Sequence, residues 1–484
     1  MKTNRNLTTH HSLPTATNYR WVICAMLFFA TTINYMDRQV LSLTWMDFIA
    51  PEFHWTNSHY GTITSLFSIF YALSMLFAGR FVDWLDTKKG FLWAIGVWSV
   101  GACLHALCGV ATQWWAGVDS ASALAAVQNT DVVAKILTVS VTLFIFARLV
   151  LAIGESGNFP AAIKATAEYF PKKDRAFATS IFNAGATVGA LAAPVTIPVI
   201  AKYWGWEMAF LIIGALGFVW MGFWVFIYKK PEANPKVNAA ELAYIQQDNI
   251  ANDSAEPTAE PKIPFLRCFT FRQTWAFVVG KFMTDGVWWF FLFWTPAYLS
   301  SVYGLKSSDP KSQAAIFVLY AITLLAIVGG WLPAYFIKKG LNPYAGRMRA
   351  MLIFAFFPLL ALLAQPLGHL SYWFPVLIIG VAGAAHQAWS ANIFSTVGDM
   401  FPRSAVATVT GIGGMAGGVS SFLINKSSGV LFDHAAQTGM TFMSFRGIEA
   451  GYFIIFSICA VAYLIGWSIM KILVPKYELV VSSE

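Results

Sequence analysis

Long apolar stretches, separated by short polar ones, make up most of this chain of 484 residues. Each apolar stretch has about 20 residues or more, which is enough for a helix to cross the hydrocarbon core of a bilayer. Spanning segments are expected to be helical, because no water inside a bilayer satisfies the backbone N–H and C=O groups. Twelve spans are predicted: residues 20–47, 58–80, 91–111, 138–164, 176–201, 206–228, 273–301, 313–337, 349–367, 371–397, 405–432 and 449–473. The expected fold class is therefore an all-α membrane protein.

The longest polar stretch inside the chain divides these spans into six and six. The domain prediction is a polar tail at 1–19, a six-helix bundle at 20–228, a linker at 229–272, a second six-helix bundle at 273–474 and a tail at 475–484. The N-terminal tail lacks the apolar core and the small-residue cleavage site of a signal peptide. The first apolar stretch is therefore expected to be retained as a helix.

A weak internal repeat relates the two predicted bundles. Residues 168–171 (EYFP) recur as residues 399–402 (DMFP), each after one span and before a span rich in small residues. Those later spans carry Gly-x-x-x-Gly at 185–189 and at 413–417, a spacing that lets helices approach closely. We interpret the matching positions as duplication, and we expect two pseudo-symmetric six-helix bundles.

Composition and charge agree with a membrane protein, since 57% of the residues are hydrophobic and only 12% are charged. With the N-terminus inside, 22 Lys and Arg residues fall in inner segments and 5 in outer loops, the bias that sets membrane topology. We expect a monomeric, multi-pass protein of the inner membrane with both termini in the cytoplasm. The net charge of +8 follows from this bias and does not indicate nucleic acid. The five cysteines are scattered without a Cys-x-x-Cys pair, and no metal or cofactor is expected.

Ionisable residues within a predicted span are costly, and they usually mark the path of an ion or a substrate. Arg148 and Glu155 lie seven positions apart in the fourth span, which is about two helical turns and places them on one face. Gly154, Gly157 and Pro160 are expected to interrupt the helix around Glu155. A broken helix at membrane depth is tolerated where it is buried or lines a cavity.

Cations inside the spans can serve as partners for a carboxylate substrate, which arginine can grip with two hydrogen bonds. Three candidate cations lie in the predicted spans: Arg38, Arg148 and Lys281. The alternative is that each is only a structural ion-pair partner, of Asp37, Glu155 and Asp285 respectively.

Asp37 and Glu155 are the predicted proton carriers. Burial raises the pKa of a carboxyl group and a nearby arginine lowers it, so such a pair can titrate near neutral pH. A proton arriving on Glu155 would free Arg148 from its counter-ion. The alternatives are a permanent salt bridge for Glu155 and a helix-breaking polar turn for Asp37.

Uncharged residues of the predicted spans complete the candidate site, because they offer hydrogen-bonding groups and stacking surfaces. The candidates are Tyr35, Tyr71, Asn183, Trp389, Ser390 and Asn392. Trp389 and Asn392 lie three positions apart, so we expect them to share a face and to line the cavity together. His386 occupies the position that corresponds to Glu155 in the second half, and we interpret it as a histidine satisfied between helices.

A polar loop after the second span resembles a known family. Gly79, Asp83, Lys88 and Lys89 match the pattern G-x-x-x-D-x-x-G-x-[RK]-[RK] of the major facilitator superfamily, whereas Asp86 replaces the second glycine. The resemblance implies two pseudo-symmetric bundles of six helices each. In this family the loop latches helix ends and biases the outward–inward equilibrium. Because Asp86 replaces this glycine, the sequence does not establish whether the loop forms the tight turn of the family.

Within that superfamily the chain resembles the anion:cation symporter family, and especially bacterial hexuronate transporters. The segments that carry the resemblance are residues 34–38 (NYMDR), 148–160, 280–281, 288–294 (WWFFLFW) and 387–392 (QAWSAN). The resemblance implies a proton-coupled symporter that imports an anionic sugar acid, such as glucuronate or galacturonate, by alternating access.

Two alternatives to this function remain open at this point. The first is a transporter for another organic anion, such as an aldonate, tartrate or a dicarboxylate. A membrane sensor built on a transporter fold is the other alternative, although the short tail and linker favour transport. No Walker loop, G-x-S-x-G or H-E-x-x-H motif occurs, so an enzyme is not expected.

Overall fold

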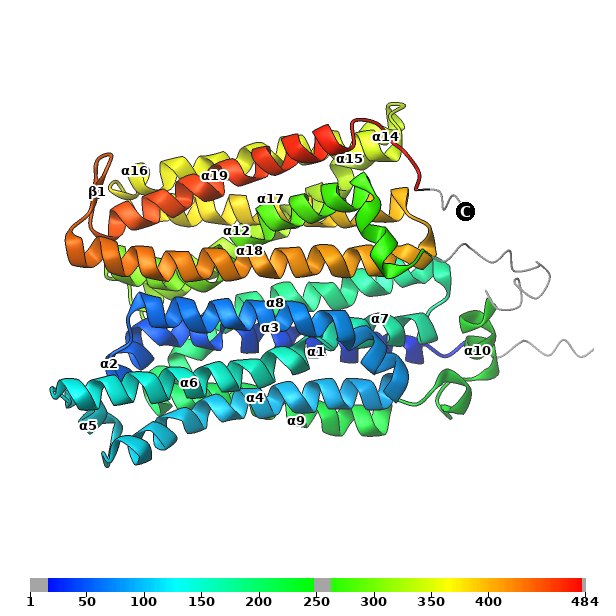
Figure 1. The fold of residues 1–484 in the computed structure, drawn as a ribbon. Helices are drawn as coiled ribbons and strands as arrows, with labels where there is room; N and C mark the ends of the chain where they lie inside the picture. Colours follow the sequence, from blue (N-terminus) through cyan, green and yellow to red (C-terminus); the bar gives the residue numbers. More distant parts are fainter. Residues whose placement is uncertain (1–15, 248–262, 481–484) are drawn as a thin grey trace, which may run out of the picture.

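A computed structural model describes residues 16–247 and 263–480, and these are almost entirely helical (Figure 1). The first half of the chain contains α1 (Tyr19–Thr44), the π-helical turn η1 (Trp45–Ile49), α2 (Ala50–Phe53), α3 (Asn57–Leu85), α4 (Thr87–Ala116), α5 (Ala121–Ala126), α6 (Thr130–Glu155), α7 (Asn158–Tyr169), α8 (Lys172–Trp204) and α9 (Trp206–Ile227). The linker contains the 3-10 turns η2 (Pro231–Ala233) and η3 (Phe265–Thr270) and the helix α10 (Ala239–Ile245).

The second half of the chain contains α12 (Arg272–Tyr303), α13 (Pro310–Ile322), η4 (Thr323–Ile327), α14 (Val328–Lys338), α15 (Pro343–Phe356), η5 (Phe357–Leu363), α16 (Ala364–Gly368), α17 (Trp373–Met400), α18 (Arg403–Thr438), the hairpin strands β1 (Thr441–Phe442) and β2 (Phe445–Arg446), and α19 (Ile448–Leu473). The strands pair antiparallel, with Thr441 opposite Arg446.

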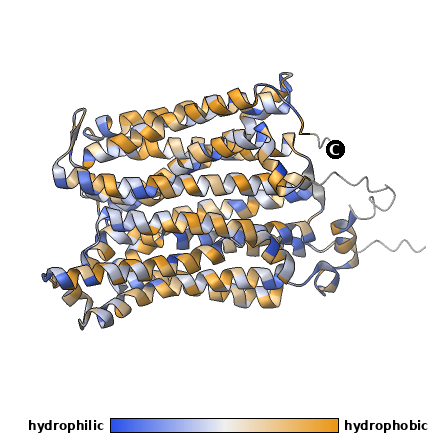
Figure 2. Cartoon of the chain, viewed as in Figure 1, coloured by the Kyte–Doolittle hydropathy of each residue, from blue (hydrophilic) through white to orange (hydrophobic). Residues whose placement is uncertain are grey.

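The all-α membrane fold is confirmed. Within the described residues, ten helical stretches are long and apolar enough to cross a membrane. The other two predicted spans are α1 and α18, which are long helices with more polar sequences. Apolar residues run along the helices, and polar residues gather at the ends of the molecule and in the linker (Figure 2).

The two ends of the molecule are distinguished by what they carry. The end with α10 and the described C-terminus is called the linker end below, and the end with α2, α5 and the β-hairpin is called the hairpin end (Figure 1). Across the two halves, α3 packs along α18 and α8 packs along α13.

In each half, a Gly-x-x-x-Gly motif places one helix in close contact with a neighbouring helix. A Cβ atom on Gly185 or Gly189 would collide with backbone oxygens of α1, so α8 lies directly against α1. A Cβ atom on Gly413 or Gly417 would collide with side chains of α12, so α18 lies directly against α12. The predicted close approach is confirmed, and the two pairs occupy corresponding places in the repeat.

Hydrogen bonds between the halves close the hairpin end. The Asp433 carboxylate of α18 accepts hydrogen bonds from the backbone N–H groups of Asn57 (3.0 Å) and Ser58 (2.7 Å), and so caps α3 from the other half. The Asp47 carboxylate of η1 accepts hydrogen bonds from Ser300 Oγ at 2.7 Å and from the Ser307 N–H at 2.5 Å. These contacts hold the halves together on the hairpin side of the molecule.

The linker is attached to the start of α1. The buried Glu241 carboxylate of α10 accepts hydrogen bonds from the backbone N–H groups of Tyr19 (3.1 Å) and Arg20 (3.0 Å). Arg20 Nη1 also contacts Glu241 Oε1 at 3.2 Å. A carboxylate at this position satisfies free donors of the first turn and interacts favourably with the helix dipole. The linker thereby fixes where α1 begins.

The turn that lacks a family glycine forms nevertheless. Asp86 adopts a φ of 71°, the left-handed region that glycine favours, between α3 and α4. Its carboxylate accepts a hydrogen bond from the Thr87 N–H at 2.9 Å and lies 3.4 Å from Lys230 Nζ. Burial opposes ionisation of Asp86, but these two partners outweigh burial and hold its pKa below the usual value. Side-chain interactions therefore replace the missing glycine.

The other residues of the loop motif lie at the end of α3 and the start of α4. Gly79 lies in α3 with open space around it, and Asp83 lies in the same helix near its end. Lys88 Nζ donates a hydrogen bond to the Val225 carbonyl at 2.7 Å, and Lys89 is exposed. The gating role of this loop stays a prediction.

A buried carboxylate lies at the hairpin end. Glu52 Oε2 in α2 accepts a hydrogen bond from Trp206 Nε1 at 2.7 Å, and its side chain is 8% exposed. Burial raises the pKa of Glu52 to about 7, the Trp206 hydrogen bond opposes this rise, and Glu207 adds to it. The folded protein thus holds this proton more tightly than an unfolded chain, where the pKa is near 4.5.

We predict that Glu52→Gln removes a pH-dependent loss of stability. The contribution of Glu52 is favourable below pH 4.5 and is lost as the pH rises through about 7. The variant should therefore be more stable than the natural protein at pH 8, by on the order of 3 kcal/mol in the free energy of unfolding, and equally stable at pH 4. Thermal unfolding of purified protein measures this, with the exposed Glu478→Gln as control. A pH-independent difference would contradict the prediction.

Candidate functional site

A buried ion pair joins two helices of the first half, α1 and α6. Arg38 of α1 donates from Nε (3.0 Å) and Nη2 (2.7 Å) to the same Oε2 atom of Glu155, at the end of α6. The exposed fractions of the two residues are 4% and 1%. Such a charge-assisted contact is strong where water is excluded. Sequence analysis placed Glu155 with Arg148 and Arg38 with Asp37 in its ion-pair alternative, and both pairings are wrong.

The pairing follows from helix geometry. Arg148 and Glu155 share a face of α6, but seven residues separate them by about 10 Å along the axis. Arg38 instead projects from the facing helix α1 at the level of Glu155. The helix does end at Glu155, as predicted, and α7 begins at Asn158 after a short interruption.

Close packing against α4 fixes the position of Glu155. A Cβ atom on Gly154 would collide with the backbone of Trp98, and a Cβ atom on Gly101 would lie 2.5 Å from the Leu151 nitrogen. Only glycine permits helices to approach this closely at both points. The end of α6 is therefore held in place by its neighbour, and the Glu155 carboxylate is aimed at α1.

Three aromatic rings surround the Arg38 guanidinium. Its Cζ atom lies 5.2 Å from the ring centre of Tyr35, 4.7 Å from that of Tyr71 and 5.0 Å from that of Trp289. Cation–π contacts of this kind stabilise a desolvated arginine. Trp289 belongs to α12, so the second half of the chain completes this aromatic box.

Trp289 was missed as a site residue, although it lies within the aromatic run 288–294 that carries part of the resemblance. Nothing in a single sequence shows that position 289 faces Arg38. Tyr35 and Tyr71 were both predicted, and the structure brings them together around Arg38.

Several buried polar atoms near the ion pair have no hydrogen-bond partner among the described residues. They are Arg148 Nε and Nη1, both carboxylate oxygens of Asp37, and Glu155 Oε1. Asp37 nevertheless lies within electrostatic range of Glu155, Arg148 and Arg38. The Arg148 guanidinium lies over the Phe67 ring at 5.2 Å.

Unpartnered buried groups are costly, and they mark a place where a ligand or water completes the site. The side chains of Asn34 and Asn158 are also buried without partners among the described residues. Both flank the ion pair in sequence, four positions before Arg38 and three after Glu155. Neither was predicted as a site residue, although an amide side chain inside a predicted span could have indicated each of them.

The second half contains an ion pair of a different kind. Lys281 Nζ lies 2.7 Å from Asp285 Oδ2, one turn further along α12. The ammonium also lies 4.3 Å from the ring centre of Phe394 in α17. This is the pairing that sequence analysis gave as the structural alternative for Lys281.

His386 is satisfied between helices, as interpreted from the sequence. Its Nδ1 atom hydrogen-bonds with the Tyr463 hydroxyl of α19 at 2.7 Å, and its ring stacks on Trp288 at 5.3 Å. The contact joins α12, α17 and α19.

The neutral candidates Trp389 and Asn392 of the tenth span have different neighbours. Trp389 is fully buried and packs edge-on against Tyr463 of α19, with 5.6 Å between the ring centres. Asn392 Nδ2 donates to the Gly329 carbonyl of α14 at 2.7 Å and to the Ala388 carbonyl at 2.8 Å. The two contact different neighbouring helices, but Trp389 Nε1 and Asn392 Oδ1 are both buried without a partner among the described residues. The expectation that they line a cavity together stays a prediction.

Ser390 is half-buried in α17, and Asn183 is exposed on α8. Neither has a hydrogen bond that ties it to the ion pair among the interactions described. Within the described chain, no three His, Cys, Asp or Glu side chains come together in a way that could hold a metal ion.

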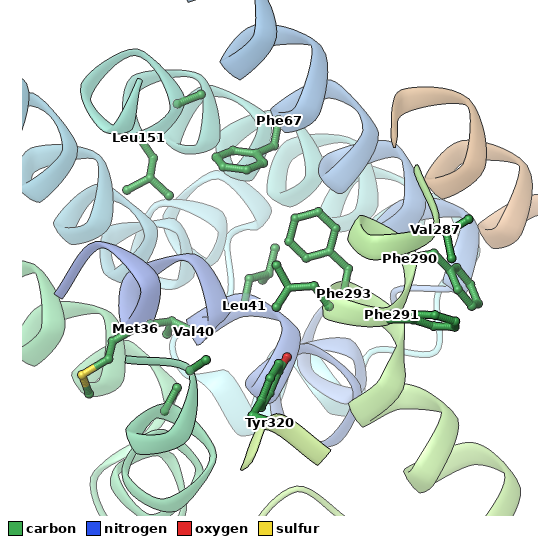
Figure 3. Packing of buried hydrophobic residues seen from close by; sticks show 14 of the residues in the cluster. Met36, Val40, Leu41, Phe67, Leu151, Val287, Phe290, Phe291, Phe293 and Tyr320 are labelled. Atoms are coloured by element: carbon green, nitrogen blue, oxygen red, sulfur yellow. The ribbon is translucent and has the colours of Figure 1, made fainter. Parts of the chain in front are cut away.

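An apolar and aromatic layer separates the site from the hairpin end. Figure 3 shows four buried residues of this layer: Val40 and Leu41 of α1, Phe293 of α12 and Tyr320 of α13. Directly after α1, the first residue of η1 begins a layer of fully buried rings. Trp45 stacks on Tyr60 at 4.1 Å, and the Tyr60 hydroxyl donates to the Phe293 carbonyl at 2.7 Å.

The fold and the site define a class of protein: a multi-pass membrane transporter with a buried charged centre between two helical halves. The family profile of the Major Facilitator Superfamily matches residues 27–424. The chain belongs to this superfamily, and the predicted resemblance is confirmed. Members of the family are transporters and not enzymes.

Relatives with described transport roles resemble the chain over most of its length. It is 27% identical to the hexuronate transporter of Escherichia coli (strain K12) over 419 residues, which are 86% of this chain and 88% of that one. It is 26% identical to the galacturonate transporter of Dickeya chrysanthemi over 319 residues, or 66% and 83% of the two chains. It is 23% identical to the probable galactarate/D-glucarate transporter GarP of Escherichia coli (strain K12), over 89% and 93%.

Solved structures with the same fold have lower identity. A bacterial homologue of the human lysosomal transporter Spinster, inward-facing and occupied, matches with a TM-score of 0.68 at 17% identity, covering 95% of this chain and 97% of that one. A D-xylose–proton symporter matches with a TM-score of 0.64 at 14% identity, covering 93% and 97%. These similarities support the twelve-helix fold alone.

We predict that Glu155→Ala strongly destabilises the protein, because it leaves the Arg38 guanidinium buried without its counter-ion. Breaking a buried pair on one side costs about 3 kcal/mol or more. Replacing both partners, by Arg38→Met with Glu155→Leu, should recover most of that loss. Thermal unfolding of the purified variants measures both effects. A double variant that is less stable than Glu155→Ala would contradict this account.

Proposed function

We propose that the protein is a proton-coupled symporter that imports an anionic sugar acid, a hexuronate such as glucuronate or galacturonate, by alternating access. The observation that carries the proposal is the buried Arg38–Glu155 pair inside an aromatic box to which both halves contribute. A cation held by a protonatable carboxylate at the junction of two halves suits coupled binding of an anion and a proton.

The proposed coupling is a competition for Arg38. A substrate carboxylate and the Glu155 carboxylate both need this guanidinium, and a buried site disfavours two anions on one cation. Protonation of Glu155 removes one competitor and frees Arg38 for the substrate. Binding of the anion is then favoured with a proton on Glu155, which is the basis of symport.

Asp37 and Arg148 supply a second carboxylate and a second cation beside this pair. Because the hydrogen-bonding atoms of Asp37 lack partners among the described residues, they are free to take up a proton or a water molecule. Tyr35, Tyr71 and Trp289 offer hydroxyl groups and ring faces for the sugar. Lys281 contributes the cation of the second half.

The proposed orientation places the linker end in the cytoplasm, in the inner membrane of the cell. Lys88, Lys89 and Lys230 gather at that end, as do both described ends of the chain. The positive-inside rule assigns such clusters to the cytoplasmic side. The proposed working unit is a single chain without cofactor, with lipid and a small anion as its partners.

Two of the relatives agree with this proposal, since one is a hexuronate transporter and the other a galacturonate transporter. None of them supports the sensor alternative. A panel of candidate substrates tests the alternative that the protein transports another organic anion, such as an aldonate, tartrate or a dicarboxylate.

We predict that uptake of radiolabelled glucuronate into proteoliposomes needs an inward proton gradient and stops with a protonophore. Glu155→Gln keeps a hydrogen-bond acceptor for Arg38 but carries no titratable proton. It should retain counterflow exchange and lose gradient-driven accumulation by tenfold or more, an order of magnitude that follows from uncoupling. Accumulation that persists in the variant, or in the presence of the protonophore, would contradict proton coupling through Glu155.

We predict that Arg38→Ala abolishes binding of glucuronate, because a carboxylate without a cation is strongly disfavoured in a dry site. The loss should be about 100-fold or more in affinity, as for a desolvated charge pair. The matched control is Arg347→Ala, whose arginine pairs with Asp399 at 2.7 Å on the linker side. Titration calorimetry on purified protein measures both, and near-normal affinity in Arg38→Ala would place the anion site elsewhere.

A further inference from the structure

An apolar groove lies on the outer face of the first half, between α4, α6 and α9. Its volume is 440 Å³, and the residues that line it include Leu92, Trp93 and Val100 of α4 and Phe218 and Met221 of α9. Trp93, Val100 and Phe218 are exposed although they are large and apolar. The helices α4 and α9 lie side by side at the edge of the first half that faces away from the second half (Figure 1). The groove therefore opens toward lipid and is separate from the buried ion pair.

One face of α4 lines the groove along the helix axis. Leu92, Gly96 and Val100 recur every four residues, and they extend over about 12 Å of the helix. A Cβ atom on Gly96 would lie 3.3 Å from Met221 Cε, so glycine keeps the space beside α9 open at this point. An extended hydrocarbon chain suits a groove of this kind, since no charged or polar side chain lines it.

Two lysines lie at the linker end of the groove. Lys88 and Lys89 belong to the first turn of α4, each one helical turn before a residue that lines the groove. Lys88 Nζ donates a hydrogen bond to the Val225 carbonyl at 2.7 Å. Val225 follows Met221 by four residues in α9, so it also lies one turn from the lining. The Lys88 ammonium is therefore placed between α4 and α9, where the groove ends.

The surroundings of these two lysines carry further positive charge. Lys229 and Lys230 follow α9 and are exposed. The neighbouring carboxylates are Asp86, which lies 3.4 Å from Lys230 Nζ, and Glu168, which accepts a hydrogen bond from the Thr87 hydroxyl at 2.6 Å. Four lysines and two carboxylates leave a net positive charge among these groups. Basic clusters next to the end of a membrane span attract anionic lipid headgroups.

We propose that this groove and the lysines at its end bind an anionic phospholipid from the leaflet at the linker end. The phosphate lies against Lys88 and Lys89, and one acyl chain lies in the groove. Val100 is 12 residues beyond Lys88, or about 18 Å along the helix axis, and one leaflet is half of a hydrocarbon core of about 30 Å. The groove thus reaches about as deep as a single leaflet. This site goes beyond the proposed function and does not depend on which acid is transported.

A second copy of the chain is the other apolar partner that this face could meet in a membrane. Copies in one membrane share an orientation, so a symmetric pair through this face would place its two lysine clusters at the same depth. Like charges that face each other across an interface are unfavourable. The lysines therefore favour an anionic lipid over a second copy.

Native mass spectrometry of the full-length purified protein in detergent tests the site, with dioleoyl phosphatidylglycerol as the probe. Dioleoyl phosphatidylcholine carries the same chains on a zwitterionic headgroup, and glycerol phosphate carries a phosphate without chains. The natural protein should bind the phosphatidylglycerol about tenfold or more tightly than the phosphatidylcholine. It should not bind glycerol phosphate measurably. Equal affinities for the two lipids overturn the proposal.

The headgroup contact is tested by Lys88→Gln combined with Lys89→Gln. The double variant should bind phosphatidylglycerol about 30-fold more weakly, because each lysine near a headgroup contributes roughly fivefold. Lys338→Gln combined with Lys339→Gln removes two exposed lysines at the end of α14 and is the matched control, with unchanged affinity. If the first double variant fails to fold, the exposed Lys89→Gln decides alone, with a loss of roughly fivefold. Natural affinity in a folded lysine variant overturns the site.

The groove itself is tested by Val100→Phe, which adds a ring at an exposed position of the lining. This variant should bind phosphatidylglycerol about tenfold more weakly, the effect of displacing about two methylene groups. Val110→Phe, at an exposed valine of α4 beyond the groove, is the matched control and should bind as the natural protein does. Unchanged binding in Val100→Phe overturns the place of the acyl chain. A lipid-free dimer that becomes monomeric in Val100→Phe would assign this face to a second copy and overturn the lipid site.

Discussion

The burial of the Arg38–Glu155 pair is the constraint on which the rest of the site depends. Taking two charges out of water costs several kcal/mol per ion, and the cost is recovered only when geometry and further contacts are favourable. Several contacts in the structure meet this condition. Gly154 and Gly101 let α6 lie directly against α4, and Glu241 fixes the start of α1. Three aromatic rings then surround the guanidinium.

The helices were predictable from the sequence because length and hydropathy act locally. A stretch of about 20 apolar residues has few alternatives to a spanning helix. The Gly-x-x-x-Gly contacts were predictable for the same reason, since small residues determine how near a neighbour can come. Which neighbour fills the space is a different question, and spacing on one helix does not answer it. Glu155 therefore forms its ion pair with Arg38 of α1 and not with Arg148.

The same limit applies to the rest of the site. Trp389 and Asn392 do share a side of α17, but residues three apart still differ by about 60° around the axis. That angle is enough to place one against α19 and the other against α14. Trp289 could not be found at all, because its contact with Arg38 joins the two halves and no local pattern records it. Arg38, Tyr35 and Tyr71 were found because their residue types are unusual at membrane depth.

The two ion pairs differ in how they respond to a motion of the halves. Lys281 and Asp285 lie one turn apart on a single helix, so their distance does not change when helices move. Arg38 and Glu155 come from different helices, and the Trp289 ring that covers Arg38 comes from the other half of the chain. Any rearrangement that separates the halves must uncover Arg38 and weaken its cation–π contact, whereas the on-helix pair is carried along unchanged. The proposed coupling therefore falls on the charge that is sensitive to the motion of the halves.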